Sequence, residues 1–178
     1  MGVNKIILGS GHLYAMEFEG TIPETSAICT EENRLGYISG GCVLEYKPTY
    51  YDAKDDLGFV MKSIITEEEA MLKAGVMTLN GDTLTKLCET GRVSESDGVK
   101  TVLIGGVNNK NGKKYVVCFH YSDPADGDIW LMIVGQNQAG FSMAFAKDKE
   151  TVIDAEFKAL PHIDEQGTLI KYIEKSKA

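Results

Sequence analysis

Residues 64–75 read IITEEEAMLKAG, and this stretch decides between a helical and a β-sheet fold. Thr66 and Glu69 have the spacing of a capping box, in which both side chains satisfy free backbone N–H groups at a helix start. A helix from Thr66 would hold Gly75 in its interior, which costs about 1 kcal/mol relative to alanine. From residue 70 onward the sequence instead has the period of a strand. The residues on the expected core side are Ala70, Leu72, Ala74 and Val76. We therefore predict a strand.

The flanking sequence predicts that this strand is half of a long β-hairpin. Residues 41–54 mix Val, Tyr and Thr as strands do, although Pro48 removes one N–H group from any ladder there. Residues 55–58 read Asp-Asp-Leu-Gly, which is typical of a turn. The run at 59–79 then forms the returning strand.

A single helix is expected after this hairpin. Asn80 offers an N-cap side chain, and apolar residues follow at helical spacing up to Cys88. Gly91 stands where a C-cap glycine belongs, so the helix should have about three turns.

The rest of the chain predicts more strands. We expect a hairpin of residues 99–107 with 113–121, turning near Asn111-Gly112, and Tyr115, Val117, Phe119 and Tyr121 on one face of its second strand. Other strands are expected at 12–18, 128–134, 141–146, 153–159 and 168–174, with Phe141, Met143 and Phe145 facing inward. Residues 20–33 are expected to form an extended arm or loop. The fold prediction is one domain, residues 1–178, that is mainly β: an antiparallel β-sandwich or barrel with one α-helix and long β-hairpins.

Composition restricts the functional class. The chain has 178 residues, of which 43% are hydrophobic and 25% charged, as in an ordinary soluble domain. Four scattered cysteines without a Cys-x-x-Cys pair predict free, buried thiols in a reducing cytoplasm. No apolar run has the roughly 20 residues of a membrane helix, so no membrane partner is expected. The net charge of −8 argues against a nucleic-acid binder, which needs clustered Lys and Arg.

Catalytic patterns are also missing from the sequence. No phosphate-binding loop or nucleophile elbow occurs, and His12, His120 and His162 have no metal-ligand spacing. The successive glutamates at 67–69 alternate faces in a strand, so only two of them can converge. We expect no enzyme activity, catalytic residue, metal or cofactor. The glutamates then form either a solvated face or a functional acidic surface.

Several segments together resemble the tail tube (major tail) proteins of long-tailed bacteriophages, from about Leu44 to Glu174. They read LEYKPTYYDAKDD, IITEEEAMLKAGVMTLNGDTLTKLC, IGGVNNKNGKKYVVCFHY, ADGDIWLMIVGQNQAGFSMAFAKDKETVIDAEFKALP and GTLIKYIEK. The resemblance implies a structural β-sandwich protomer whose hexameric rings stack into a hollow tube for the genome. It also implies a place in the virion tail, assembly in the cytoplasm of the host bacterium, and contacts with tape-measure, tail terminator and baseplate or tail-tip proteins. Tubes of bacteriocin particles and secretion systems share this protomer fold.

Two sets of surface residues follow from the strand pattern and the resemblance. Residues opposite the core side of the strands would face the lumen, where an excess of carboxylates lets DNA slide without specific binding. These are Glu67, Glu69, Lys73, Asp154, Glu156 and Lys158. Polar residues of the arm and the hairpin turn would make contacts between rings and become ordered only on stacking. These are Thr21, Glu24, Glu31, Glu32, Asp55 and Asp56.

A monomeric β-barrel that binds a small ligand is the alternative from another class. Trp130 and the Phe and Tyr residues would line its pocket. Only a tube subunit should form rings or filaments.

Overall fold

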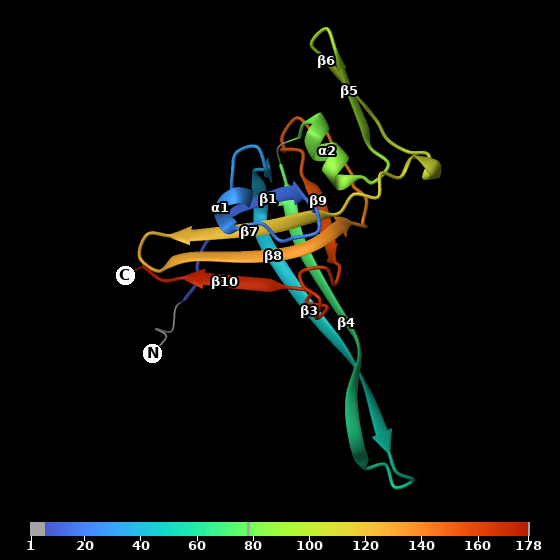
Figure 1. The fold of residues 1–178 in the computed structure, drawn as a ribbon. Coiled ribbons are helices and arrows are strands. Elements are labelled where there is room, and N and C mark those ends of the chain that lie inside the picture. Colours follow the sequence, from blue (N-terminus) through green and yellow to red (C-terminus); the bar gives the residue numbers. More distant parts are fainter. Residues whose placement is uncertain (1–5, 78, 178) are drawn as a thin grey trace.

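The computed structural model describes residues 6–77 and 79–177, and it is mainly β (Figure 1). The two short α-helices among these residues are α1 (Thr25–Ile28) and α2 (Gly81–Leu87), with a 3-10 turn at Val107–Asn109. The strands are β1 (His12–Glu17), β2 (Arg34–Gly36), β3 (Ile38–Lys54), β4 (Val60–Val76), β5 (Arg92–Ser96), β6 (Val99–Leu103), β7 (Tyr115–Asp123), β8 (Gly127–Asn137), β9 (Ile153–Ala159) and β10 (Lys171–Lys175). None of the described helices is long and apolar enough to cross a membrane.

Eight strands form one antiparallel sheet that branches at β8. Its main order is β2-β1-β7-β8-β9-β4-β3, while β10 pairs with β8 beside this path. Residues 128–132 of β8 pair with β10, and residues 135–137 pair with β9. The β3–β4 hairpin consequently crosses the β7, β8 and β10 strands at a steep angle (Figure 1). The prediction of a mainly β, antiparallel fold is confirmed. The sheet is not a closed barrel, because β2 and β3 stand at its two ends and, among the described strands, each pairs on one side only.

Two hydrophobic cores lie on opposite faces of β1, β7 and β8. On β7, Val117 and Phe119 belong to the larger core, which also takes in the inward residues of β4 and β9. Val116 and Cys118 belong to the second core, which Ile28 of α1 covers. The predicted face of residues 115, 117, 119 and 121 is therefore confirmed.

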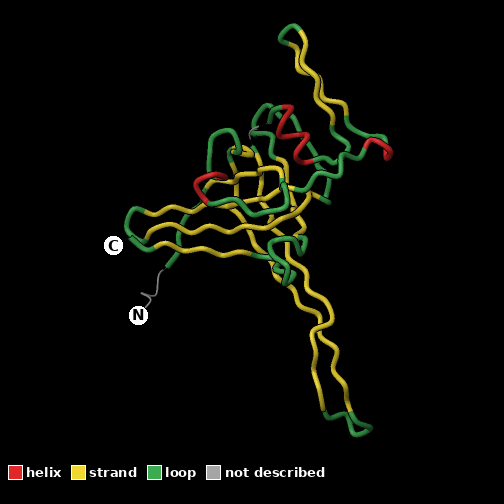
Figure 2. Tube along the Cα trace, in the orientation of Figure 1, coloured by secondary structure: helices red, strands yellow, loops and turns green. Residues whose placement is uncertain are grey.

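Residues 64–75 belong to strand β4 of the β3–β4 hairpin and form no helix. Residues 70, 72, 74 and 76 are buried, as the strand prediction required. Thr66 caps no helix, since its hydroxyl donates a hydrogen bond across the hairpin to the Thr49 carbonyl at 3.2 Å. The register of the hairpin shifts between Thr49 and Tyr50. The end of the hairpin projects alone, away from the body (Figure 2).

The predicted helix after the hairpin is present as α2, but it is shorter than the three turns expected, and it is not the only helix. The Asn80 side chain accepts a hydrogen bond from the Thr83 backbone N–H at 2.8 Å, as an N-cap should. The helix ends at Leu87 with Cys88 as its C-cap, so Gly91 lies beyond it. A second helix, α1, occupies the segment predicted as an extended arm, because Ile28 finds a buried site on the sheet.

The predicted hairpin of 99–107 with 113–121 is wrong. Asp97 and Gly98 both have positive φ angles, 53° and 77°, and form a tight turn that pairs β6 with β5. The β7 strand pairs with β1 and β8 instead. The Asp-Gly pair is thus a stronger hairpin signal than Asn111-Gly112.

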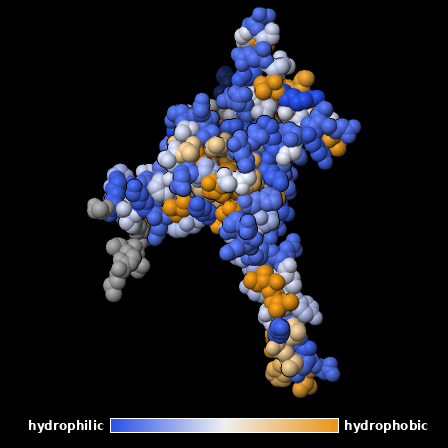
Figure 3. Space-filling view, in the orientation of Figure 1, coloured by the Kyte–Doolittle hydropathy of each residue, from blue (hydrophilic) through white to orange (hydrophobic). Residues whose placement is uncertain are grey.

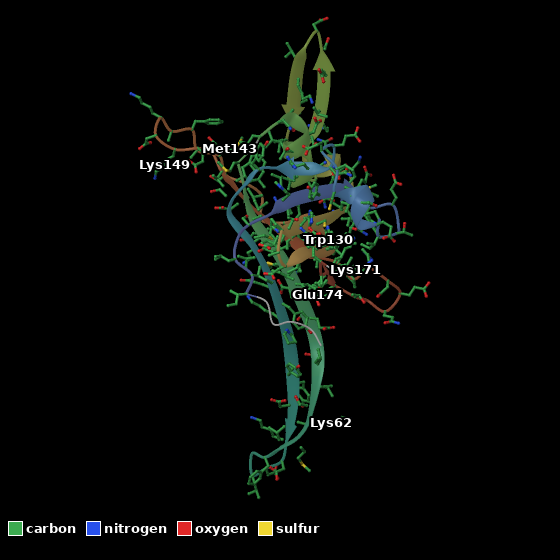
Figure 4. All side chains as sticks on the ribbon, turned by 90° about the vertical axis from the view of Figure 1, so that its left-hand side faces the viewer. Lys62, Trp130, Met143, Lys149, Lys171 and Glu174 are labelled. Carbon is green, nitrogen blue, oxygen red and sulfur yellow. The ribbon has the colours of Figure 1, made fainter. Side chains whose placement is uncertain are left out.

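The predicted strand at 141–146 is also wrong. These residues form no strand, and Phe145 is 84% exposed. Met143 and Lys149 lie on a loop that projects from the body (Figure 4). Of these residues, only Phe141 packs partly against the larger core. The alternating run forms no strand because no described neighbouring strand offers it backbone hydrogen bonds.

Candidate functional site

The six residues predicted to face a lumen share one face of the β4–β9 strand pair. Lys73 lies directly opposite Glu156, and Gly75 lies opposite Asp154. Because successive strand residues alternate faces, Glu67 and Glu69 project on the same side as Lys73, and Lys158 on the same side as Glu156. Sequence reasoning therefore grouped these residues correctly, and their position relative to a lumen stays a prediction.

The same face continues onto β3, where sequence reasoning missed two charged residues. Glu45 pairs with Met71, and Lys47 pairs with Glu69, so both belong to this face. Knowledge of the β3–β4 register would have found them. We call this set the polar face: Glu45, Lys47, Glu67, Glu69, Lys73, Asp154, Glu156 and Lys158.

Ion pairs tie the polar face together without neutralising it. Lys73 Nζ lies 3.1 Å from Glu45 Oε2. Lys158 Nζ lies more loosely, 3.9 Å from Glu69 Oε1. The hydrogen bond from Lys73 lowers the pKa of Glu45, and the same bond raises the pKa of Lys73. Both groups are therefore charged at neutral pH, and carboxylates outnumber amines on this face.

A hollow of about 340 Å³ opens on the polar face at the base of the hairpin. Lys73 and Glu156 line it together with Gly40 and Gly41. The two glycines have φ angles of 80° and 78° and form an irregularity in β3. Their missing side chains leave space beside the charged residues.

The projecting half of the β3–β4 hairpin exposes apolar side chains on both faces. Tyr50 pairs with Ile65 on one face, and Tyr51 pairs with Ile64 on the other. Toward the tip, Phe59 is 69% and Met61 75% exposed. Figure 3 shows hydrophobic residues along this hairpin down to its end. Exposed apolar patches of this kind mark interaction surfaces.

The predicted inter-ring residues fall into two separate groups. Thr21, Glu24, Glu31 and Glu32 are exposed around α1, while Asp55 and Asp56 lie at the far tip of the hairpin (Figure 1). The structure does not bring the groups together.

Both groups make local contacts within the single chain, and the expectation that they become ordered only on stacking stays a prediction. Glu31 forms a 2.9 Å ion pair with Arg34. Asp55 Oδ1 accepts hydrogen bonds from the backbone N–H groups of Leu57 and Phe59, at 3.2 and 2.8 Å. Buried Ile28 and the Asp55 turn supply the local contacts that hold these segments.

The outer edge of β3 is another surface that could bind a strand of a second chain. β3 has 17 residues and, among the described strands, pairs only with β4, so one edge of it has no strand partner there. Pro48, midway along the strand, has no backbone N–H group to donate. Edge strands of this length are normally shielded or paired with another chain.

The surroundings of Trp130 differ from those of a ligand pocket. Its ring stacks on His120 with centroids 4.9 Å apart, and His120 Nε2 lies 3.0 Å from Asp128 Oδ1. Trp130 is absent from the residues lining the cavity of about 410 Å³ beside α2, where Lys86, Lys113 and polar amides predominate. His120 is half-buried. Within the described part of the chain, no three His, Cys, Asp or Glu residues cluster to hold a metal ion.

No model of a known protein family matches the chain, and no curated protein sequence matches it.

Proposed function

We propose that the protein is the structural subunit of a bacteriophage tail tube, forming hexameric rings that stack into a conduit for the genome. The observation that carries the proposal is the projecting hairpin with apolar residues on both faces. The resemblance of residues 44–174 to tail tube proteins supplies the ring number and the cargo.

The projecting part of the β3–β4 hairpin is expected to have low stability when it is surrounded by water alone. A two-stranded hairpin without further packing is at best marginally stable. Burying one large apolar side chain is worth about 1.5–3 kcal/mol, and this hairpin exposes several, including Tyr50, Tyr51 and Phe59. A hairpin that is apolar on both sides fits between two surfaces, which neighbouring copies of the chain would provide.

The free sheet edges support closure into a ring. In a head-to-tail interface the outer edge of β3 pairs with a different edge of the next copy. When each copy is related to the next by the same rotation, the set closes into a ring. Closure removes the unpaired edges that an open sheet leaves in the monomer.

In such a ring the polar face would line the lumen. Its excess of carboxylates repels phosphates, so DNA passes without the counterion-releasing contacts that bind it. Tape-measure, tail terminator and baseplate or tail-tip proteins are the expected partners, in a virion tail assembled in the host cytoplasm. A bacteriocin or secretion tube would share the subunit contacts but carry no genome.

Substitutions in the hairpin test the proposal. The variant Phe59→Ser with Met61→Ser removes two exposed apolar groups, and Lys54→Ser with Lys62→Ser is the matched control on the same segment. We expect the first variant to stay a folded monomer by circular dichroism and sedimentation, while the control forms rings or tubes like the native chain. Equal assembly by both variants would contradict the proposed role of the hairpin.

A further inference from the structure

The second core brings together two thiols from opposite halves of the chain. Cys29 is the C-cap residue of α1, and Cys118 lies in the middle of β7. The Cys29 and Trp130 side chains both pack against the second core, to which Cys118 belongs. The Cys29 side chain interacts there with Cys118 and with Trp130. Both cysteines are free in this structure.

The other two cysteines have different surroundings. Cys42 packs against the larger core, and Cys88 lies 3.5 Å from the Thr90 hydroxyl. Only Cys118 is fully buried, so the expectation of four buried thiols is only partly met. Cys29 is half-buried, so it is less enclosed than Cys118.

We infer that Cys29 and Cys118 form an oxidisable dithiol that closes into a disulfide when a hydroperoxide is the oxidant. With hydrogen peroxide, the Cys29 thiolate attacks one oxygen, the O–O bond breaks, and one water leaves after protonation. The Cys118 sulfur then attacks the resulting sulfenic acid at Cys29, the S–O bond breaks, and a second water leaves. In total, two electrons and two protons pass from the thiols to the peroxide.

The surroundings make this reaction slow at neutral pH. Burial raises the pKa of the Cys29 thiol and, more strongly, that of the Cys118 thiol. The reactive form is the thiolate, so the rate of closure rises with pH. The dithiol therefore tolerates reducing conditions and mild oxidants and responds to sustained oxidation.

Closure would fix α1 to β7. A disulfide between positions this far apart restricts the unfolded chain strongly, and it would tie the exposed residues around α1 to their own protomer. This inference rests on the second core alone and does not depend on the proposed tube function.

Peptide mapping of the native chain tests the inference. The protein is treated with hydrogen peroxide at pH 8, alkylated, digested without reduction and analysed by mass spectrometry. We expect a linked peptide pair containing Cys29 and Cys118, formed within one chain and removed by a reductant. The variant Cys42→Ser with Cys88→Ser should give the same pair, and Cys29→Ser should give none.

The single tryptophan supplies a second readout. Because Trp130 contacts Cys29, disulfide closure should change its fluorescence in the native chain and not in Cys29→Ser. Absence of the linked pair from the folded, peroxide-treated native chain would overturn the inference. A pair that forms only between chains would overturn it as well.

Discussion

Asp123, at the turn between β7 and β8, shows how one carboxylate fixes a local conformation. Its Oδ1 atom accepts hydrogen bonds from the backbone N–H groups of Ala125 and Asp126, at 2.7 and 2.9 Å. These bonds favour the ionised form and lower the pKa of Asp123. The folded protein therefore holds this group charged at a pH where the unfolded chain has begun to bind a proton.

The lowered pKa predicts a pH effect with a defined sign. The stabilisation is fully present above the ordinary aspartate pKa of about 3.9, and it is lost as pH falls through the lower pKa of the folded state. Asp123→Asn keeps an acceptor oxygen but cannot titrate, so its free energy of unfolding should fall less steeply below pH 4. Urea unfolding between pH 5 and 2.5 measures this, with exposed Glu165→Gln as the control. Identical slopes for Asp123→Asn and the native chain would refute the assignment.

Charge reversal on the polar face tests its proposed role. Glu67→Lys with Glu69→Lys should still permit tubes, since neither residue is buried in the core. Genome delivery should slow, and the slowing should diminish at high salt, because added lysines bind phosphates through counterion release. The rate of DNA ejection from particles carrying the variant measures this. Exposed loop residues provide the control variant Glu150→Lys with Glu165→Lys, and equal rates for both variants would defeat the lumen assignment.

At the scale of elements, the β8–β9 pair connects the β3–β4 hairpin side of the sheet to β7, β1 and β2. Gly135 pairs there with Ala159, and an added Cβ would lie 2.3 Å from the Lys158 carbonyl oxygen. Real Cβ atoms do not approach a backbone oxygen so closely. Glycine is therefore required by the close approach of the two strands.

Gly135→Ala should separate β9 from β8. Forcing atoms into a packed site costs about 1–3 kcal/mol, so the free energy of unfolding should fall by at least that amount. Hydrogen exchange should show lost protection in β9 first. Gln138→Ala, an exposed neighbour in the chain, should be nearly neutral in the same denaturation experiment. A native-like stability for Gly135→Ala would mean that the β8–β9 contact is looser than described.

The elements also show how far sequence reasoning reaches. Period-2 patterns with a buried side, as in β4 and β9, were predictable because one face of each strand packs against the core. The role of Asn80 as the N-cap of α2 was predictable in the same way. The run at 141–146 alternates in the same way yet forms no strand, since no neighbour supplies hydrogen bonds. Pairing partners and register come from tertiary contacts, so Glu45 and Lys47 could not be placed beside Glu69 and Lys73 in advance.

At the scale of the whole molecule, the shape is a compact body with a long hairpin reaching away from it. Trp130 lies within the body, whereas Lys62 lies near the distant end of the hairpin (Figure 4). The β5–β6 hairpin extends from the opposite end of the body (Figure 1). Two projections at opposite ends suit a subunit that contacts neighbours on both sides along an axis.

We propose that this shape belongs to a self-assembling tube subunit. Association would bury the apolar side chains of the hairpin and satisfy the free edge of β3, and both effects favour the assembled state at high protein concentration. A monomeric small-ligand-binding protein, in contrast, would remain a single chain as its concentration rises.

Electron microscopy of the purified native chain over a range of concentrations, with symmetry analysis of end-on views, tests this claim most directly. We expect hollow rings or tubes with sixfold symmetry that become more abundant as concentration rises. Particles that remain single chains at every concentration would contradict the tube function, and rings of another order would contradict the hexamer.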